Sequence, residues 1–571
     1  MTRRHRGGAN RCGGRGHTRG LGAALIAAAA LHAPAVLAQP AAAPAAPAAR
    51  TSPASTTAGT ERKVVVDRYT VQGNTLLAAE HLREVTAPFL GIVGPSDLAA
   101  AAAAVQQAYR RAGWGGVVAF LPEQDFAGGT AIVRVVEGRL ARYVVAENRR
   151  FNAANVRASL PSLQRAKPVN VRRVDTEIQM ANENPAKTVA VMLEPGDQFG
   201  AVNAFVTVHE QPVSRFTARD DNTGSKATGR WRAALGWQHA NVWDLDHVFA
   251  IEGQTAPEDP QAVKVFSTSY RAPLYEHALA VDGYYAWSNV DGGRVDTAAG
   301  ELQFAGRGSI AGARLSAYLA RLGNTDQRLQ LGLESRAYRN TCTIAGLPPG
   351  ACGAAGESVS VQPMSLTWTL QATSTWRWGL SMGLHHNLAF GGQRSKQAAF
   401  DAVRPGARRR YTLARMHATL GTALGESFAV NARLALQGTG DPLVPGEMFG
   451  LGGANTVRGY EERELNGDSG AALSLELAGW NWGASLGERF ASLRGFELRP
   501  ILFADAGAVQ NRDDAPCRAG QTRCPATSAG IGLRAGWRDL QLRIDAAHAL
   551  KDAGVTQAGH ERVHASLAFN F

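Results

Sequence analysis

Two short motifs in the C-terminal third of the chain carry the side chains best suited to a specific polar contact. The first is Val457-Arg458-Gly459-Tyr460, in loop-like sequence, and the second is Phe503-Ala504-Asp505-Ala506-Gly507, in strand-like sequence. A guanidinium group can hold a carboxylate through two parallel hydrogen bonds, so Arg458 and Asp505 have the chemistry of an ion pair. Such a contact would fasten a loop to a strand rather than catalyse a reaction.

The sequence around both motifs has the pattern of amphipathic β-strands. Near the C-terminus, Val563, Ala565, Leu567, Phe569 and Phe571 alternate with polar residues. Apolar-out, polar-in segments of about ten residues, joined by alternately short and long connections, are typical of an outer-membrane barrel. A soluble β-sandwich or propeller is the alternative, but it would turn its apolar faces inward. From about residue 212 to the C-terminus, the chain divides into about 16 such segments.

The connections between these segments differ in length, as expected for the two ends of an outer-membrane barrel. Short connections are expected near 244–246, 425–426 and 538–539, and long ones near 341–358, 391–409, 439–470 and 510–526. The stretch 298–340 fits either two strands or three, which leaves the number of strands open by one pair.

Before the barrel, two stretches repeat one order of elements. In residues 63–140 we expect a strand at 64–71, helices at about 77–90 and from the N-cap candidate Ser96, and strands at about 117–121 and 130–136. In residues 141–211 we expect a strand at 142–151, helices at 155–162 and 171–181, and strands at 189–193 and 202–208. The predicted fold class is therefore two α+β modules (β-α-α-β-β) followed by an all-β antiparallel transmembrane barrel over 212–571.

The N-terminus has the features of an export signal over residues 1–38. Six arginines precede the apolar run from Leu21 to Leu37, and small residues end that run. A transmembrane anchor is the alternative, but the run is short, Ala-rich and broken by His32 and Pro34. The Pro- and Ala-rich residues 39–62 are expected to form a linker, which disfavours a helix before the first module.

The charge balance argues against nucleic acid as a partner. The chain has 60 Lys and Arg against 48 Asp and Glu, and residues 1–38 contain six of the arginines and no acidic residue. Without the signal the net charge falls from +12 to +6 and is spread along the sequence. Nucleic-acid binding needs a concentrated basic stripe instead.

The five cysteines reduce to two close pairs once Cys12 is removed with the signal. The pairs Cys342–Cys352 and Cys517–Cys524 lie in loop-like sequence of an exported chain, so two local disulfides are expected. A metal site is the alternative, but no histidine lies near either pair and the spacing is not that of C-x2-C ligands. No metal or other cofactor is predicted.

The order of motifs along residues 63–571 resembles that of the outer-membrane transporters of two-partner secretion, the TpsB family of haemolysin and filamentous-haemagglutinin secretors. The first module has V-Q-G-N-T-L-L (71–77), A-Y-R-R-A-G-W (108–114), L-P-E-Q-D-F (121–126) and V-V-E-G-R-L (135–140). The second has N-P-A (184–186) and L-E-P-G (193–196), and the barrel has D-N-T-G-S (221–225), G-R (229–230), V-R-G-Y and F-A-D-A-G. The two modules then resemble polypeptide-transport-associated (POTRA) domains.

This resemblance implies a protein translocase of the Gram-negative outer membrane with its modules in the periplasm. The modules would bind an unfolded exoprotein, which carries an N-terminal secretion domain, by adding its strand to their sheet edges. The barrel would then pass the exoprotein to the cell surface without nucleotide hydrolysis. Outer-membrane lipids and the barrel-assembly machinery are the other expected partners. A barrel-assembly insertase of the same superfamily is the first alternative and a passive porin the second.

The resemblance also places the connection 439–470, hereafter the lumen loop, inside the barrel, and it implies that Arg458 pairs with Asp505. Strand parity agrees, because Phe503, Asp505 and Gly507 share one face of their strand and the glycine leaves room for a loop. Phe569 and Phe571 are expected to form the C-terminal assembly signal.

One motif in the lumen loop matches a sequence motif of an enzyme class. Residues 467–470 read Gly-Asp-Ser-Gly, as in the nucleophile stretch of trypsin-like proteases. The chain offers no convincing upstream His and Asp context for this serine, and a motif needs its structural context. No catalytic residue and no enzymatic activity are predicted.

Overall fold

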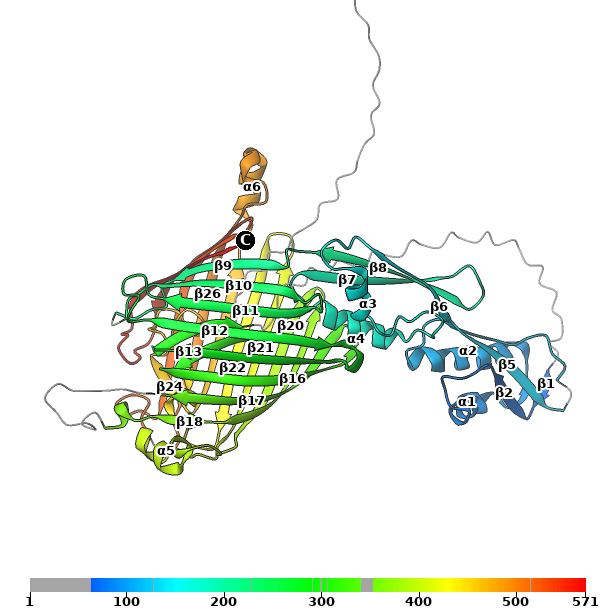
Figure 1. Ribbon diagram of the computed structural model, residues 1–571, viewed down its shortest axis with the longest axis horizontal. Coiled ribbons are helices and arrows are strands. Elements are labelled where there is room, and N and C mark those ends of the chain that lie inside the picture. The colour runs from blue at the N-terminus through cyan, green and yellow to red at the C-terminus, as the bar shows by residue number, and fades with distance from the viewer. Residues whose placement is uncertain are drawn as a thin grey trace, which may run out of the picture.

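The computed structural model describes residues 63–126, 128–226, 228–289, 291–297, 300–305, 307–339, 353–513 and 515–571. The expected signal (1–38), the expected linker (39–62) and the Cys342–Cys352 pair lie outside these residues. The described chain forms two small α/β modules at one end of a large β-barrel (Figure 1). No helix in this part of the chain is both long enough and apolar enough to cross a membrane.

The first module is built on a three-stranded sheet in the order β2-β5-β4. Strand β2 (Arg68–Gln72) runs parallel to β5 (Thr130–Glu137), and β4 (Val117–Phe120) pairs antiparallel with β5. Helices α1 (Ala79–Thr86) and α2 (Pro95–Arg111) bury Leu82, Val105 and Tyr109 against this sheet. Two further short strands, β1 (Val64–Val66) and β3 (Gly91–Val93), pair with each other.

Both helices of this module differ slightly from the prediction. Helix α2 begins at Pro95, one residue before the expected N-cap Ser96, because a proline fits the first helical position and has no N–H to satisfy there. Gly94 is the N-cap, and its N–H donates to the Asp97 carboxylate at 2.9 Å. Helix α1 ends before residue 90, because the chain continues as the one-turn helix η1 (Ala87–Phe89).

The second module repeats the order of elements. Its sheet has the order β6-β8-β7, with β6 (Arg139–Ala146) parallel to β8 (Ala201–Glu210) and β7 (Lys187–Pro195) antiparallel to β8. Helix α4 (Val171–Ala181) has the predicted bounds, whereas α3 (Ala153–Ala158) is shorter than predicted. Strand β6 also ends before the predicted residue 151, because the Asn148 side chain donates to the Phe151 carbonyl and closes a turn. The predicted fold class of the two modules is confirmed.

The rest of the described chain closes into an antiparallel barrel, as predicted. Strands β18 and β19 pair with the same neighbour, β17, so they count as one strand and the barrel has 16. The strands are β9 (Ser214–Asp221), β10 (Arg232–Val242), β11 (His247–Thr255), β12 (Lys264–Leu274), β13 (Leu279–Ser288), β16 (Gly308–Leu322), β17 (Thr325–Tyr338), β18 (Val359–Val361), β19 (Pro363–Thr373), β20 (Trp376–Asn387), β21 (Thr412–Leu424), β22 (Phe428–Thr439), β25 (Ser469–Ala478), β26 (Glu497–Gln510), β27 (Arg523–Trp537), β28 (Leu540–Ala549) and β29 (Glu561–Asn570).

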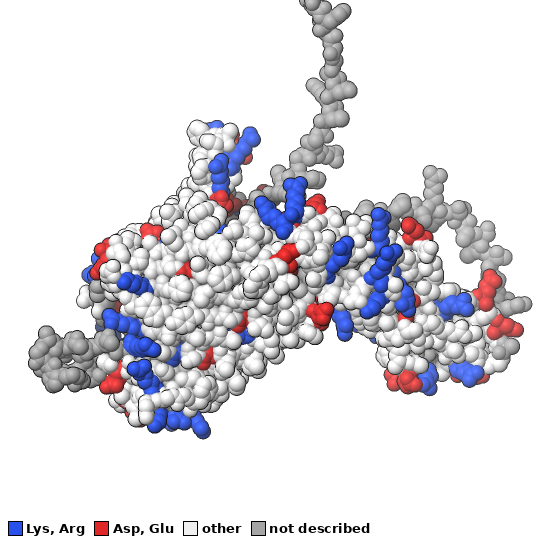
Figure 2. Space-filling view, in the orientation of Figure 1, with Lys and Arg blue, Asp and Glu red and all other residues white. Residues whose placement is uncertain are grey.

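The two faces of the barrel wall have opposite character. On β26, Leu502 points outward with 58% of its surface exposed, while its neighbours Phe503 and Asp505 are buried on the inner face. The same alternation holds on β29, where Val563 and Leu567 are exposed and His564 is buried. On the face seen in Figure 2, the outer wall is largely uncharged, with most charged side chains on the modules and toward the ends of the barrel.

Connections at the end of the barrel nearest the modules are short, as predicted at 244–246, 425–426 and 538–539, with one exception. Residues 479–496 link β25 to β26 and contain helix α6 (Trp482–Arg489) and the one-turn helix η6 (Ala491–Leu493). At the opposite end, the connection between β20 and β21 contains helix α5 (Gln397–Val403). Within the stretch 298–340, the strands β16 and β17 belong to the barrel. Strand β15 (Gly300–Ala305) pairs instead with β14 (Asp291–Thr297), which precedes the stretch.

Candidate functional site

The lumen loop folds back into the barrel between β22 and β25. It contains a one-turn helix, η5 (Pro445–Glu447), and a small hairpin of β23 (Phe449–Leu451) and β24 (Leu465–Gly467). Val457 and Tyr460 are fully buried in an apolar cluster with Leu451 of the loop and Val509 of the barrel wall. Because apolar loop side chains pack against the inner wall, the loop occupies the lumen at this level.

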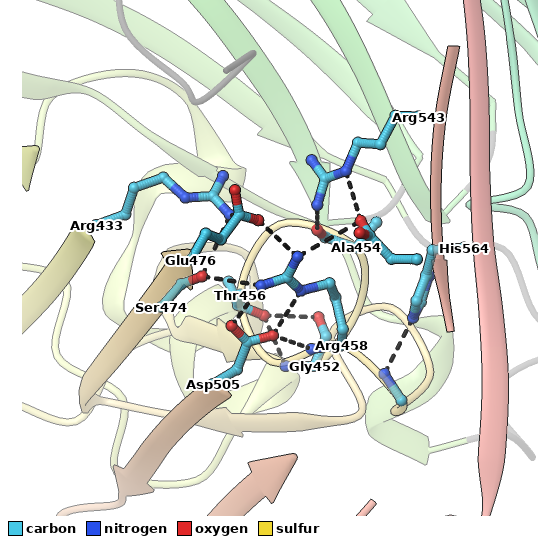
Figure 3. Close-up of polar contacts among 12 residues, drawn as sticks. Arg433, Gly452, Ala454, Thr456, Arg458, Ser474, Glu476, Asp505, Arg543 and His564 are labelled. Carbon is cyan, nitrogen blue, oxygen red and sulfur yellow. Dashed lines mark hydrogen bonds and ion pairs between the residues drawn. The ribbon is translucent and has the colours of Figure 1, made fainter. Parts of the chain in front are cut away.

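The structure brings Arg458 and Asp505 together at the tip of this loop (Figure 3). The Arg458 Nε and Nη2 atoms donate to the two oxygens of Asp505 at 2.7 and 2.8 Å, and the backbone N–H of Arg458 donates to the same carboxylate at 3.1 Å. Both side chains are almost fully buried. This is the two-pronged geometry that makes arginine–carboxylate pairs strong and orientation-specific.

The other two residues of the strand motif shape the space around this pair. The Arg458 guanidinium carbon lies 3.5 Å from the centre of the Phe503 ring, so the cation stacks on an aromatic face. A Cβ atom on Gly507 would lie 2.4 Å from the Cδ1 of Leu451, so the glycine provides the room that the loop needs. The F-x-D-x-G spacing therefore places a ring, a carboxylate and a gap along one face of β26.

Further charged residues of the barrel wall surround the pair. Arg458 Nη1 donates to Glu476 at 2.6 Å and lies 3.5 Å from Asp545, whereas Arg534 binds both of these carboxylates. Arg433 lies 3.7 Å from Glu476, and Arg543 contacts both Asp545 and the Ala454 carbonyl of the loop. Glu476 and Asp545 each alternate with apolar residues in the sequence, which places them on the lumen side of their strands, but nothing in the sequence identifies them as partners of Arg458.

The remaining motif residues hold the tip in place through the backbone. Gly459 has a φ of +94°, a conformation that favours glycine, and its N–H donates to His564 Nε2 at 3.0 Å. The Tyr460 hydroxyl lies 2.9 Å from the Thr527 carbonyl and 2.8 Å from the Lys551 carbonyl. All four residues of the V-R-G-Y motif are therefore buried and in contact with the barrel.

Two more carboxylates anchor the base of the lumen loop. Asp468 is fully buried and receives two hydrogen bonds from Arg404 and one from the Leu443 N–H. Glu447 receives two hydrogen bonds from Arg336, at 2.9 and 3.0 Å. The aspartate of the protease-like Gly-Asp-Ser-Gly stretch thus has a structural role.

A second set of buried polar contacts joins the second module to the barrel. Glu183, beside the N-P-A motif, binds Arg271, Tyr318 and Arg328, all on the inner face of barrel strands. The Asn184 side chain of that motif donates to the Ala240 carbonyl at 2.7 Å. The second module is therefore fixed to the rim of the barrel by charged groups that are removed from water.

Two buried carboxyl groups of the modules, those of Glu137 and Glu177, have shifted pKa values. Burial raises the pKa of Glu137, but hydrogen bonds from Thr75, Leu76 and Tyr109 outweigh it and hold the pKa below its usual range. These contacts join three of the motifs in the first module. Burial raises the pKa of Glu177 on α4 to about 7, against the opposing effect of hydrogen bonds from Ser162.

The barrel closes where its last strand meets its first. Strand β29 pairs with β9 from Ser566 to Asn570, and Phe571 exchanges two backbone hydrogen bonds with Phe216. The aromatic rings of Phe571 and Phe216 are stacked 5.6 Å apart, and Phe569 stacks on Phe571. The two phenylalanines of the predicted assembly signal thus lie at this seam, whereas their role in assembly stays a prediction.

One of the two predicted disulfides falls within the residues that the structure describes. Cys517 and Cys524 form a disulfide in the connection between β26 and β27. Among the described residues, no group of three or more His, Cys, Asp and Glu side chains is arranged to hold a metal ion.

Comparison with known proteins gives this arrangement a family. Residues 203–535, more than half of the chain, match the model of the haemolysin secretion/activation protein ShlB/FhaC/HecB family, and residues 64–138 match the POTRA domain of ShlB type. The chain belongs to this family. It is therefore an outer-membrane transporter of the two-partner secretion type, with its modules facing the periplasm. The family and the localisation predicted from the sequence are confirmed.

Individual relatives agree with this placement. The outer membrane transporter CdiB of Escherichia coli O6:K15:H31 is 26% identical over 496 residues, which cover 81% of this chain and 76% of the relative. The heme/hemopexin transporter protein HuxB of Haemophilus influenzae is 20% identical over 421 residues, covering 71% of this chain and 70% of the relative.

Solved structures show the same fold. CdiB from Escherichia coli superposes with a TM-score of 0.72 at 21% identity, over 91% of this chain and 93% of that one. CdiB from Acinetobacter baumannii superposes with a TM-score of 0.67 at 16% identity, over 90% and 91% of the two chains.

Proposed function

We propose that this transporter captures one unfolded exoprotein in the periplasm through residues 63–140 and 141–211 and passes it through the lumen of the barrel over 212–571. The observation that carries the proposal is the loop held inside a closed barrel by Arg458 and Asp505, in a chain that also has two periplasmic modules. A lumen obstructed by a fastened loop suits a regulated path for a polypeptide better than a permanently open porin.

Free sheet edges offer the first contact with an unfolded chain. Strand β7 lies at the edge of the second sheet, and among the described residues its pairing partner is β8 alone. An extended polypeptide can add to such an edge through backbone hydrogen bonds, which give affinity with little demand on sequence. Met192, an exposed side chain on β7, would give apolar contact to the added strand.

A cavity lies where the two modules meet the rim of the barrel. It has a volume of about 740 Å³ and is lined by Trp114 of the first module, Glu177 of the second, and Tyr275 and Tyr318 of the barrel rim. It therefore touches all three parts of the chain. In the proposal, an extended segment released from the sheet edge passes through this junction before it enters the lumen.

Transport needs no nucleotide in this proposal, because folding of the exoprotein at the cell surface makes its return unfavourable. The glycine-rich stretch from Gly450 to Gly453 differs from a phosphate-binding loop. It includes the end of the short strand β23 and leads into the tip of the lumen loop rather than into a helix.

Barrel-assembly insertase activity is the second candidate, and the seam favours it. The ladder between β9 and β29 is the shortest between neighbouring strands of the described barrel, counting β18 and β19 as one. An insertase would open laterally at such a seam. The Asn222 side chain strengthens the seam beyond the ladder, because it donates to the Val563 carbonyl and accepts from the Ala565 N–H.

The deciding experiment is secretion of an exoprotein encoded beside this chain, in cells with and without the transporter. We expect the exoprotein in the medium only when the transporter is present, and in the periplasm when residues 63–210 are deleted. If secretion is indifferent to the transporter while other barrels fail to insert in its absence, the insertase function is correct and the proposed path is wrong.

The role of the ion pair is tested in the same assay. Arg458→Ala should reduce secretion. Arg433→Ala, which removes an arginine that contacts Glu476 and Ser474 of the wall, should leave secretion near the wild-type level. The exchange Arg458→Asp with Asp505→Arg should restore part of the activity of either single variant. Restoration stays partial because Glu476 lies beside the position of residue 458. Unchanged secretion and barrel conductance in Arg458→Ala would remove the ion pair from the mechanism.

A further inference from the structure

The connection 479–496 is an ordered insertion at the periplasmic end of the barrel. The Asn481 side chain accepts hydrogen bonds from Gly483 N–H at 3.0 Å, at the start of α6, and from Leu498 N–H at 2.8 Å, on β26. A Cβ atom on Gly483 would lie 2.5 Å from the Phe496 carbonyl oxygen, so the helix approaches the returning chain as closely as a glycine allows. The insertion therefore has a defined shape and presents a fixed set of side chains.

That set is unusually apolar for a segment outside the barrel wall. Trp480, Trp482 and Phe490 expose 53%, 40% and 51% of their surfaces. Trp482 and Leu486 lie one turn apart on one face of α6 and Phe490 directly follows the helix, whereas Ala484 and Glu488 lie on the other side of it. Contiguous exposed apolar side chains mark a contact surface rather than ordinary solvent exposure.

This surface continues the lipid-facing surface of the barrel. Trp480 meets Phe428, the first residue of β22, edge to face at 6.2 Å, and it also meets Trp482 at 6.1 Å. Phe428 and two further aromatic residues at the same end of the barrel, Trp376 and Phe571, are exposed on its outside. Tryptophan and other aromatic side chains of this kind form belts at the membrane–water interface.

Two arginines complete the pattern. Arg489 ends α6 and Arg494 follows η6, both are exposed, and neither takes part in an ion pair within the described chain. Figure 1 shows α6 projecting from the top of the barrel in this view, clear of the two modules at the right. An apolar face bordered by unpaired arginines is the composition of a helix that lies in a phospholipid interface.

We propose that residues 479–496 form a membrane-surface anchor that inserts Trp482 and Phe490 into the periplasmic leaflet and binds phospholipid phosphates through Arg489 and Arg494. The ligand is the glycerophospholipid surface itself. The anchor would fix the barrel in depth and rotation on one side of its wall. This inference does not depend on what the barrel transports, so it stands or falls separately from the proposed function.

The test uses the full chain reconstituted in bilayers of phosphatidylethanolamine and phosphatidylglycerol. A spin label is attached at Phe490→Cys, in the apolar cluster, or at Ala484→Cys, on the side of α6 opposite Trp482. The collision rate of each label is measured with oxygen, which dissolves in lipid, and with a water-soluble nickel complex. We expect the ratio of oxygen to nickel collisions to be at least about threefold higher at position 490 than at position 484, since apolar side chains of an interfacial segment reach the acyl boundary and the opposite side of the helix faces water.

Other results overturn the proposal. If both labels collide freely with the nickel complex, α6 extends into the periplasm. If both are shielded from both reagents, the surface is covered by protein, and the partner is not a membrane. The arginine contribution is tested with Arg489→Gln and Arg494→Gln, which should lower the ratio at position 490 in the anionic bilayer, and an unchanged ratio would refute the phosphate contacts. Folding of each variant is checked by its heat-modifiable electrophoretic mobility.

Discussion

Replacement of Arg458 by alanine should release the tip of the lumen loop. The arginine side chain donates three charge-assisted hydrogen bonds to carboxylates, two to Asp505 at 2.7 and 2.8 Å and one to Glu476 at 2.6 Å. In its absence, Asp505 keeps one hydrogen bond, from the backbone N–H of residue 458 at 3.1 Å. Breaking a buried ion pair by removing one partner costs about 3–5 kcal/mol, because the other charge stays buried.

The expected size of the effect follows from this cost. At about 1.4 kcal/mol for each factor of ten, the fraction of molecules with a displaced tip should rise by about two to four orders of magnitude. The base of the loop should stay attached, because Glu447 and Asp468 keep their arginine partners. The perturbation is therefore confined to the segment between β23 and β24.

Hydrogen exchange of the detergent-solubilised protein measures this opening directly. The amides of Gly453 and Arg463 are suitable reporters, because each donates a backbone hydrogen bond within the loop. Their exchange should accelerate by the same two to four orders of magnitude if exchange proceeds through local opening. Arg433→Ala is the matched control, since it also removes one arginine beside Glu476 but belongs to the wall. If the reporter amides exchange within tenfold of wild type in Arg458→Ala, the ion pair does not hold the loop.

Three further predictions concern other parts of the molecule. Gly507→Ala should displace the loop at a cost of about 1–3 kcal/mol, because the new Cβ would lie 2.4 Å from Leu451 Cδ1. The single-channel conductance of the barrel should therefore rise. Gly438→Ala is the control, because no atom lies within 4 Å of its new Cβ. Glu183→Ala should weaken the joint between the second module and the barrel by about 3–5 kcal/mol, because Arg271 and Arg328 lose a buried carboxylate. The distribution of distances between a spin label on α4 and one on the turn 323–324 should then become broader. Distributions of equal width in Glu183→Ala and in the control Glu276→Ala would contradict this. Glu177, with a pKa raised from 4.5 to about 7 by burial, binds an extra proton in the folded module between these values, so its stabilising effect is present at low pH and is lost as the pH rises through about 7. We therefore compare the hydrogen-exchange protection of α4 in the wild type with that in Glu177→Gln at each pH. The ratio of the two protection factors should fall between pH 5 and pH 8, and a ratio that stays constant would show that protonation of Glu177 does not stabilise the module.

The parts of the site that follow from local periodicity could be predicted from the sequence. Alternation along β26 puts Phe503, Asp505 and Gly507 on one face, because a strand has a period of two whatever its neighbours are. The same rule places Glu476 and Asp545 in the lumen. Their contacts with Arg458 could not be predicted, because these depend on the register of strands that the barrel brings together from distant parts of the chain.

The elements that sequence reasoning missed have weak local signals. Helix α6 has only eight residues, and two of them are glycines that a helix pattern does not favour. It is held by Asn481 and by packing on β26, which are tertiary contacts. Similarly, the N-cap of α2 is Gly94, two residues before the predicted Ser96. Serine is a common N-cap, but the proline before it is the stronger signal of a first helical turn.

If the tip of the lumen loop leaves the barrel, it takes Arg458 with it and changes the set of charged side chains on the inner wall. Of the charged side chains described around Asp505, Arg458 belongs to the loop, and the others belong to the wall. Withdrawal of Arg458 therefore leaves three carboxylates, Glu476, Asp505 and Asp545, facing three guanidinium groups, those of Arg433, Arg534 and Arg543. The vacated wall is electrically balanced at this level. A passing segment of either sign would then meet no net charge in this group of side chains, so at this level the wall would not select a cargo by its charge.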